Sequence, residues 1–338
     1  MREARPIRLH ALRWVPIVIV LGLIIHLLLP RLDTIEESFK TMRTLAPWAI
    51  AMAVLFETLS YIANGALLQS IVHLAGERLT LRRSIAIEIG AGTVALVAAG
   101  ALGFGAAIYK WTRNAGISNE GAMLASWLPT MFDSMTLVIF ALVSAAELLI
   151  LRQLSRTTMI ALTIVVSILI ALIGAAIIIV ARPDRLSAIA TRLARIFPEA
   201  DDSIIFDAAD RASRTWQMMR DGAWVRPAVF SLLVLTFDVL CLRYAFLAAG
   251  QHLYLSILLA GYGVPMLLGR ASFLPGGIAI IEVAMAALFS GLGVMSNVAV
   301  VAVLTYRLIS FWLPAAAGIP IAITLQARKR AGTGVAAA

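Results

Sequence analysis

The residues best suited to chemistry surround an interruption in an apolar stretch near the C-terminus. The stretch reads Ser272-Phe273-Leu274-Pro275-Gly276-Gly277, and the apolar run that follows holds one carboxylate, Glu282. The residue before a proline is disfavoured in helical backbone, and glycine tolerates unusual dihedral angles and leaves the backbone bare. The pattern predicts a helix that stops and restarts, with the dipole and free amides of its new N-terminus directed into a cavity. The simpler alternative is an ordinary loop between two helices.

Arg307 stands inside another apolar segment, in the sequence Thr305-Tyr306-Arg307-Leu308. A guanidinium in such surroundings requires a carboxylate, carbonyl oxygens or a phosphate, and its fork of donors suits phosphate. One interpretation is a buried ion pair between Glu282 and Arg307 that fixes two helices. The other is a direct contact between Arg307 and a bound substrate, and the two can hold in different conformations.

The composition places these residues in a membrane. Of the 338 residues, 61% are apolar and 14% are charged, against about 25% charged residues in soluble proteins, and the mean hydropathy is +0.92. In a membrane protein a net charge of +9 reports orientation and contact with anionic headgroups. Because no basic tail with interleaved aromatic residues is found, nucleic acid is excluded as a partner.

Six apolar runs are expected to be membrane spans, at residues 14–29, 47–75, 121–147, 157–181, 225–249 and 297–325. Two interrupted stretches, 84–115 and 253–292, are expected to form re-entrant or broken hairpins. Residues 182–224 have the spacing of surface-lying amphipathic helices, and 331–338 are expected to be a disordered tail. The expected fold is an all-α polytopic membrane domain over residues 1–330, with about six full spans, two hairpins and 8–9 apolar segments in all.

The first interrupted stretch carries its own candidates. Residues 84–115 hold Glu88 and many small residues, and they end in Tyr109-Lys110-Trp111-Thr112-Arg113. Small residues favour close helix packing in membranes, which is the alternative to a hairpin here. Tyr109, Lys110 and Arg113 are candidates for a lip that faces lipid headgroups, or else form a solvated interfacial cluster.

A weak internal repeat relates residues 76–150 and 253–325. A shift of 177 residues places Gly277 on Gly100 and brings the turns at 116–119 and 293–297 into register. Suppose that each hairpin returns to the membrane face from which it entered. Twenty basic residues then lie on the inner side and five on the outer side. The inner residues include those of both termini and of the segment 182–224, which is then cytoplasmic. Basic residues in short loops mark the cytoplasmic side, so this arrangement is favoured. It makes the two units inverted repeats, which are typical of transporters with a central site.

Other kinds of site are absent from the sequence. The four histidines lack metal-ligand spacing, and the single cysteine, Cys241, excludes an internal disulfide. No nucleophile–base set, paired-carboxylate site or phosphate loop can be assembled. We therefore expect no metal and no cofactor, and any transport runs on a gradient, on a partner's energy or downhill.

The C-terminal motifs resemble a known family. The matching residues are Phe273-Leu274-Pro275-Gly276-Gly277 with Glu282, the Gly293-Val294 turn, Leu304-Thr305-Tyr306-Arg307 and Phe311-Trp312-Leu313-Pro314. They resemble the second half of the lysylphosphatidylglycerol synthase transmembrane, or flippase-like (UPF0104-type), family of integral membrane proteins. The turn Gly116-Ile117-Ser118 and the following span with Asp133 resemble its first half, so the resemblance covers about residues 10–325.

The resemblance implies movement of an anionic phospholipid or related amphiphile between the leaflets of a bacterial inner membrane. By motif match, the site residues are Pro275, Gly276, Gly277, Glu282, Tyr306 and Arg307. Bifunctional members also carry a cytosolic aminoacyl-transferase domain, and nothing of that kind follows Leu325, so we do not expect an enzyme. The family often has Pro-Gly at the first break, whereas this chain has Ala98-Ala99-Gly100, which weakens the case for a symmetric site.

Two other functions stay open at this point. An intramembrane enzyme acting on a lipid headgroup has only Glu282 and Tyr306 as a thin acid–base set. A non-catalytic partner of a lipid or envelope synthesis complex would use the basic loops and the 182–224 surface. The oligomeric state is not indicated by the sequence.

Overall fold

The computed structural model describes residues 44–97, 100–150, 222–271 and 275–333, and every regular element within them is helical. The all-α prediction is confirmed for these residues. The expected spans at 14–29 and 157–181, nearly all of the expected amphipathic segment 182–224 and the last residues of the expected tail lie outside them.

Four long helices of the described chain are apolar enough to cross a membrane. They are α4 (Pro47–Leu74), α7 (Asn119–Ile150), α11 (Val225–Ala248) and a composite of α14 (Ser296–Arg307), η3 (Leu308–Trp312) and α15 (Leu313–Thr333). A helix needs about 20 apolar residues to span the hydrocarbon core, and each of the four has them. The predicted spans at 47–75, 121–147, 225–249 and 297–325 are therefore confirmed as helices. The last helix continues to Thr333, into the segment expected to be disordered.

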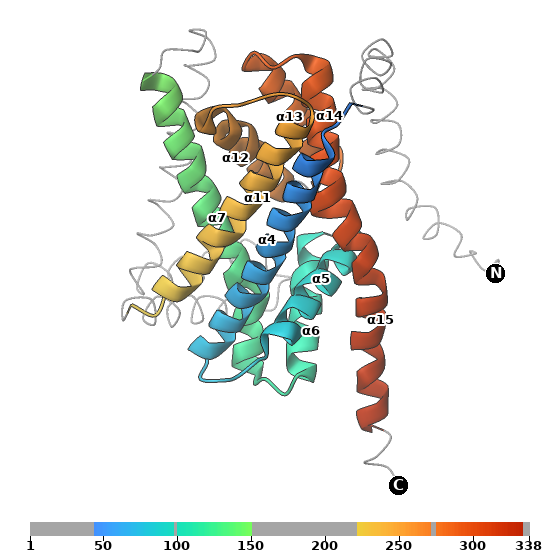
Figure 1. Cartoon of the computed structure of the whole chain (residues 1–338). Coiled ribbons are helices and arrows are strands. Elements are labelled where there is room, and N and C mark those ends of the chain that lie inside the picture. Colours follow the sequence, from blue (N-terminus) through green and yellow to red (C-terminus); the bar gives the residue numbers. More distant parts are fainter. Residues whose placement is uncertain (1–43, 98–99, 151–221, 272–274, 334–338) are drawn as a thin grey trace, which may run out of the picture.

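Four shorter helices form two hairpins. They are α5 (Leu81–Val97), α6 (Ala101–Asn114), α12 (Leu255–Ala271) and α13 (Ile280–Gly291), with 12 to 17 residues each. Each is shorter than the roughly 20 residues that a membrane-spanning helix typically needs. Figure 1 shows α5 and α6 in the lower half of the molecule and α12 and α13 in the upper half. Helix breaks thus occur in both stretches where the sequence predicted them.

The break of the second hairpin lies against a helix of the first. The short turn η2 (Pro275–Gly277), which joins α12 to α13, packs against α5, and α15 also packs along α5. Close approach of α5 and α15 depends on Gly318, where a β-carbon would overlap Thr93. The Thr93 hydroxyl donates a hydrogen bond of 2.9 Å to the Ala315 carbonyl and so ties the two helices together.

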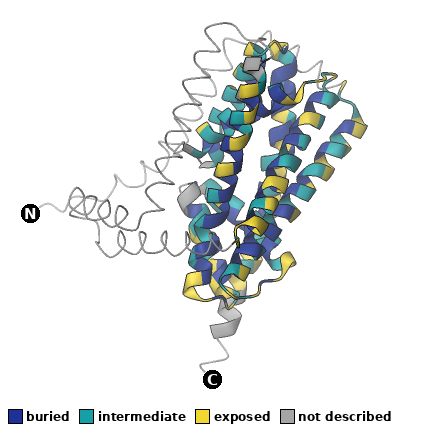
Figure 2. Ribbon diagram, turned by 90° about the vertical axis from the view of Figure 1, so that its left-hand side faces the viewer, coloured by how far each residue is buried: buried dark blue, intermediate teal, exposed yellow. Residues whose placement is uncertain are grey.

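Apolar side chains from α4, α11, α12, α13 and α14 form the main core. Tyr262, Phe246, Phe289 and Tyr306 are among its largest fully buried members, and a β-carbon at Gly261 would overlap the Phe289 ring. Figure 2 shows buried residues on the inward faces of the helices and exposed ones outside. An outward apolar surface is the pattern of a helix bundle that faces lipid.

The helix that carries Arg307 is locally widened. Residues Leu308–Trp312 form a π-helical turn directly after Arg307. Pro314 has no N–H for the carbonyl of Ser310, four residues earlier, and the Tyr61 hydroxyl of α4 donates to that oxygen instead at 3.1 Å. Single π-helical turns inside α-helices are rare, and they occur frequently at functional sites.

Candidate functional site

The break between α12 and α13 has the backbone that the proline and glycines predicted. Gly276 and Gly277 have φ values of +62° and +64°, and Ala279 has +68°. The alanine carries a strain of about 1–2 kcal/mol, because its β-carbon disfavours positive φ. A β-carbon at Gly276 would overlap the Phe311 ring. The break is therefore a tightly specified turn held against the π-helical segment, and not an ordinary loop.

Arg307 reaches this break from the neighbouring helix. Its side chain is only 4% exposed, and its Nε lies 2.7 Å from Oε1 of Glu282. One Nη donates to the Gly276 carbonyl at 3.2 Å. The guanidinium also stacks over the Phe311 ring, with 4.3 Å from its central carbon to the ring centroid. The guanidinium thus joins the turn, α13 and the π-helical segment at one buried point.

The start of α13 adds a helix N-terminus to the break. No side chain caps this helix at Ala279, and Glu282 stands in its first turn. The first N–H groups of a helix have no partner within it, and together with the helix dipole they attract an anion. Glu282 supplies that negative charge itself and pairs with Arg307 at the same time. Its other carboxylate oxygen, Oε2, is buried without a hydrogen-bond partner among the described residues.

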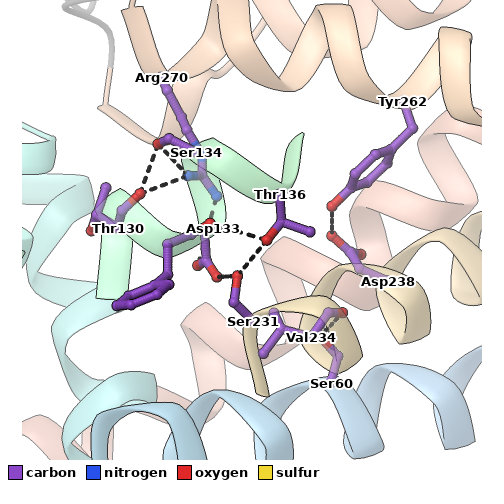
Figure 3. A network of polar contacts seen from close by, with 11 residues as sticks. Ser60, Thr130, Asp133, Ser134, Thr136, Ser231, Val234, Asp238, Tyr262 and Arg270 are labelled. Carbon is purple, nitrogen blue, oxygen red and sulfur yellow. Dashed lines mark hydrogen bonds and ion pairs between the residues drawn. The ribbon is translucent and has the colours of Figure 1, made fainter. Parts of the chain in front are cut away.

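A second polar cluster lies on α7, α11 and α12, near the end of α12 that leads into the break (Figure 3). Arg270 contacts Asp133 at 3.8 Å and donates to the Ser134 hydroxyl at 2.9 Å. The Ser231 hydroxyl donates to the other oxygen of Asp133 at 2.8 Å. Arg270 is thus paired with a buried acid.

The remaining predicted site residues are not brought to Arg307. Tyr306 is 1% exposed and packs edge-to-face on Tyr262 in the core, because consecutive helical residues point about 100° apart. Glu88 is buried on α5, and its Oε1 has no partner within the described chain.

Tyr109, Lys110 and Arg113 lie on the last two turns of α6, away from the break at Gly100. The Tyr109 hydroxyl bonds the Asn119 side chain, Arg113 donates to the Ile117 carbonyl at 2.6 Å, and Lys110 is exposed. Tyr109 and Arg113 thus hold the connection between α6 and α7.

Sequence reasoning did not assign three important partners. Phe311 was quoted only as part of a motif, although its ring supports both Gly276 and Arg307. Glu57 and Asp238 were not assigned to a site from the sequence. The usable signal was their position, since both stand well inside long apolar helices. Within the described residues no group of three or more His, Cys, Asp or Glu could hold a metal ion.

Comparison with known proteins decides the family. Residues 13–318 match the lysylphosphatidylglycerol synthase TM region. The chain belongs to this family. A UPF0104 membrane protein of Pyrococcus horikoshii is 37% identical over 94 residues, which make up 27% of each chain. The chain therefore matches about a quarter of that relative's length.

Membership in the lysylphosphatidylglycerol synthase TM region family confirms the resemblance found in the sequence. Together with the four long apolar helices, it makes this chain a multi-pass membrane protein. The matched region includes both hairpins, the break at Pro275–Gly277 and Arg307.

Proposed function

We propose that this protein moves an anionic phospholipid, or a related amphiphile, between the leaflets of a bacterial inner membrane. The observation that carries the proposal is the buried Arg307, held at a helix break by Glu282 and the Gly276 carbonyl. Desolvation of the charged headgroup is the main barrier to its passage through hydrocarbon. A guanidinium beside an uncapped helix N-terminus lowers that barrier, because it replaces water with donors that are already in place.

Glu282 allows this site to bind a lipid headgroup and to release it again. Its carboxylate occupies the position on Arg307 that a headgroup phosphate would take, and a phosphate suits the guanidinium fork equally well. A buried cation is costly without a counter-charge, so Arg307 is always paired, either with Glu282 or with the lipid. Exchange between the two anions avoids an unpaired state and lets the headgroup leave again.

The proposal includes the pair of inverted repeats at residues 76–150 and 253–325, and it extends each repeat to the long helix before it, α4 and α11. Several helix contacts correspond between the halves. Across the halves, α7 packs against α12, and α15 packs against α5. Within the halves, α4 packs against α7, and α11 packs against α14. Positive-φ glycines recur in the same order, after the first long helix (Gly76, Gly250), at the break (Gly100, Gly277) and before the last helix (Gly116, Gly293). Inverted repeats around broken helices are typical of transporters with a site at the midplane.

Labelling of introduced cysteines tests this topology. Arg78 and His252 are exposed residues in the loops that lead into α5 and α12. In a Cys241→Ala background, a membrane-impermeant thiol reagent is expected to label Arg78→Cys only from the cytoplasmic side and His252→Cys only from the opposite side. Both termini are then cytoplasmic. Labelling of both positions from one side would contradict the inverted arrangement.

Reconstitution tests the function itself. The purified protein in liposomes that contain a labelled anionic phospholipid is expected to accelerate leaflet exchange over protein-free vesicles. Mass spectrometry of the same lipids is expected to show no new product. A modified headgroup would instead support an intramembrane enzyme. Intact lipids without acceleration would refute transport and leave a non-catalytic role in a lipid or envelope synthesis complex.

A further inference from the structure

Two acidic side chains meet in the core where α4 packs against α11. Glu57 of α4 is 6% exposed, and its carboxyl group lies next to that of Asp238 on α11. The Tyr262 hydroxyl of α12 donates to one oxygen of Asp238, as Figure 3 shows. This pair is separate from the Glu282–Arg307 ion pair and has no role in the headgroup site described above.

The pair lacks the partners that two ionised carboxylates need. Oε2 of Glu57 and Oδ1 of Asp238 are buried, and neither has a hydrogen-bond partner among the described residues. Buried carboxylates are normally paired with cations or fully hydrogen-bonded. A buried oxygen without a partner on each of two neighbouring acids therefore points to a ligand that supplies positive charge.

The titratable and charged groups that act on the pair come from every helix around it. Direct interactions with the pair come from six groups: Tyr61 on α4, Cys241 on α11, Tyr262 on α12, Tyr306 and Arg307 on α14, and Asp133 on α7. Two further groups interact with members of this set: Arg270 on α12 with Tyr262 and Asp133, and Glu88 on α5 with Tyr61 and Asp133. Most of the neutral members are hydroxyls. Arg307 is the cation whose charge acts on both acids.

A proton fits the pair better than a metal ion does. Calcium and magnesium take six or more oxygen ligands, and no group of three or more acidic, histidine or cysteine side chains could hold a metal in the described part of the chain. Two neighbouring carboxyl groups in a low-dielectric site cannot both ionise, and they share one proton instead. One proton bound by the pair supplies a hydrogen-bond donor and removes the repulsion between the two carboxylates.

We propose that Glu57 and Asp238 form a proton-binding site that holds one shared proton and exchanges it with water as Arg307 changes its partner. In the exchange a water-derived proton forms an O–H bond with a carboxylate oxygen of the pair, and the same bond breaks on release. The proton site stands on its own geometry; its link to headgroup binding rests on the proposed function. An anionic headgroup at Arg307 adds negative charge near the pair and so favours the protonated form. By reciprocity, protonation favours headgroup binding, and lipid and proton move together.

Infrared difference spectroscopy of the whole protein in nanodiscs tests the proton site without any transport assay. The probe is the C=O band of a protonated carboxyl group, identified by its shift in D₂O and followed during a pH titration. Glu57→Gln and Asp238→Asn are each expected to move the remaining acid's titration to lower pH by about one unit or more, because the neighbouring negative charge is gone. Arg307→Gln is expected to move the titration of the pair to higher pH. A loss of structure common to these variants would not shift the titration to lower pH in two of them and to higher pH in the third.

Glu88→Gln is the matched control, because it removes another buried carboxyl group with an unpartnered oxygen. This variant is expected to lose the contribution of Glu88 to the C=O band and to keep the part of the titration that depends on Arg307. A titration that is unchanged in both Glu57→Gln and Asp238→Asn would overturn the proposed proton-binding site. An unchanged midpoint in Arg307→Gln would overturn its link to Arg307. A band that responds to Na⁺ at constant pH would assign the pair to a metal cation and overturn the proton. Absence of lipid exchange by the wild type refutes the proposed function alone, since the infrared titration needs no transport.

Discussion

Replacing Arg307 by glutamine is expected to weaken binding of an anionic phospholipid by about tenfold to a hundredfold. Hydrogen bonds to charged groups contribute about 1.5–3 kcal/mol, which corresponds to that range of affinity. Glu282→Gln is expected to act in the opposite direction, because it removes the carboxylate that lies 2.7 Å from the guanidinium and competes with the phosphate. Native mass spectrometry of the protein with a defined anionic lipid measures both changes.

The control for this experiment must separate binding from folding. Removing one partner of a buried ion pair costs about 3–5 kcal/mol of stability, because the other charge is left unpaired. The double variant Arg307→Gln/Glu282→Gln leaves no such charge and is expected to fold more stably than either single variant while still binding lipid weakly. Lipid affinity that is equal in Glu282→Gln, Arg307→Gln and the wild type would contradict a competition between carboxylate and phosphate.

Gly276→Ala is expected to destabilise the protein by about 2–5 kcal/mol and to abolish lipid movement. Positive φ costs an alanine about 1–2 kcal/mol, and overpacking adds about 1–3 kcal/mol. Both apply at Gly276, where φ is +62° and an added β-carbon would overlap the Phe311 ring. Because the Gly276 carbonyl accepts from Arg307, any shift of this turn also moves the guanidinium. Thermal unfolding in detergent and leaflet exchange measure the two effects.

Gly291→Ala is the matched control for that substitution. Gly291 ends α13 of the same hairpin, and no heavy atom lies within 4 Å of a β-carbon built there. Alanine is favoured over glycine in helices by up to about 1 kcal/mol, so stability and exchange should stay as they are or rise slightly. Equal losses in Gly276→Ala and Gly291→Ala would mean that the turn at Gly276 has no special role.

The sequence predicted the parts of the site that depend on local backbone chemistry. A proline followed by two glycines disfavours a continuous helix at Pro275–Gly277, and an arginine inside an apolar helix must find a counter-charge. The two interpretations offered for Arg307 therefore included the ion pair with Glu282 that the structure shows. The helix limits followed from the lengths of the apolar runs and from the turn glycines.

What the sequence could not predict are contacts between distant segments. Nothing local to Glu57 indicates that its neighbour is Asp238, 181 positions later. The same holds for Arg270 and Asp133, and for Phe311 beneath Gly276. Tyr306 was assigned to the site by motif match with the family, but helical geometry turns its side chain and that of Arg307 to different surroundings. Such pairings are set by how the helices pack, which composition and spacing leave open.

The most direct test of the central claim, that Arg307 holds the headgroup during transfer, is the rate of leaflet exchange of a labelled anionic phospholipid in liposomes. Wild-type protein, Arg307→Gln and the matched control Arg243→Gln are compared at equal amounts of folded protein, since Arg243 is an exposed arginine on α11. The expected result is rapid exchange with wild type and Arg243→Gln, and a rate at least about tenfold lower with Arg307→Gln. Wild-type exchange by the Arg307→Gln protein would contradict the claim.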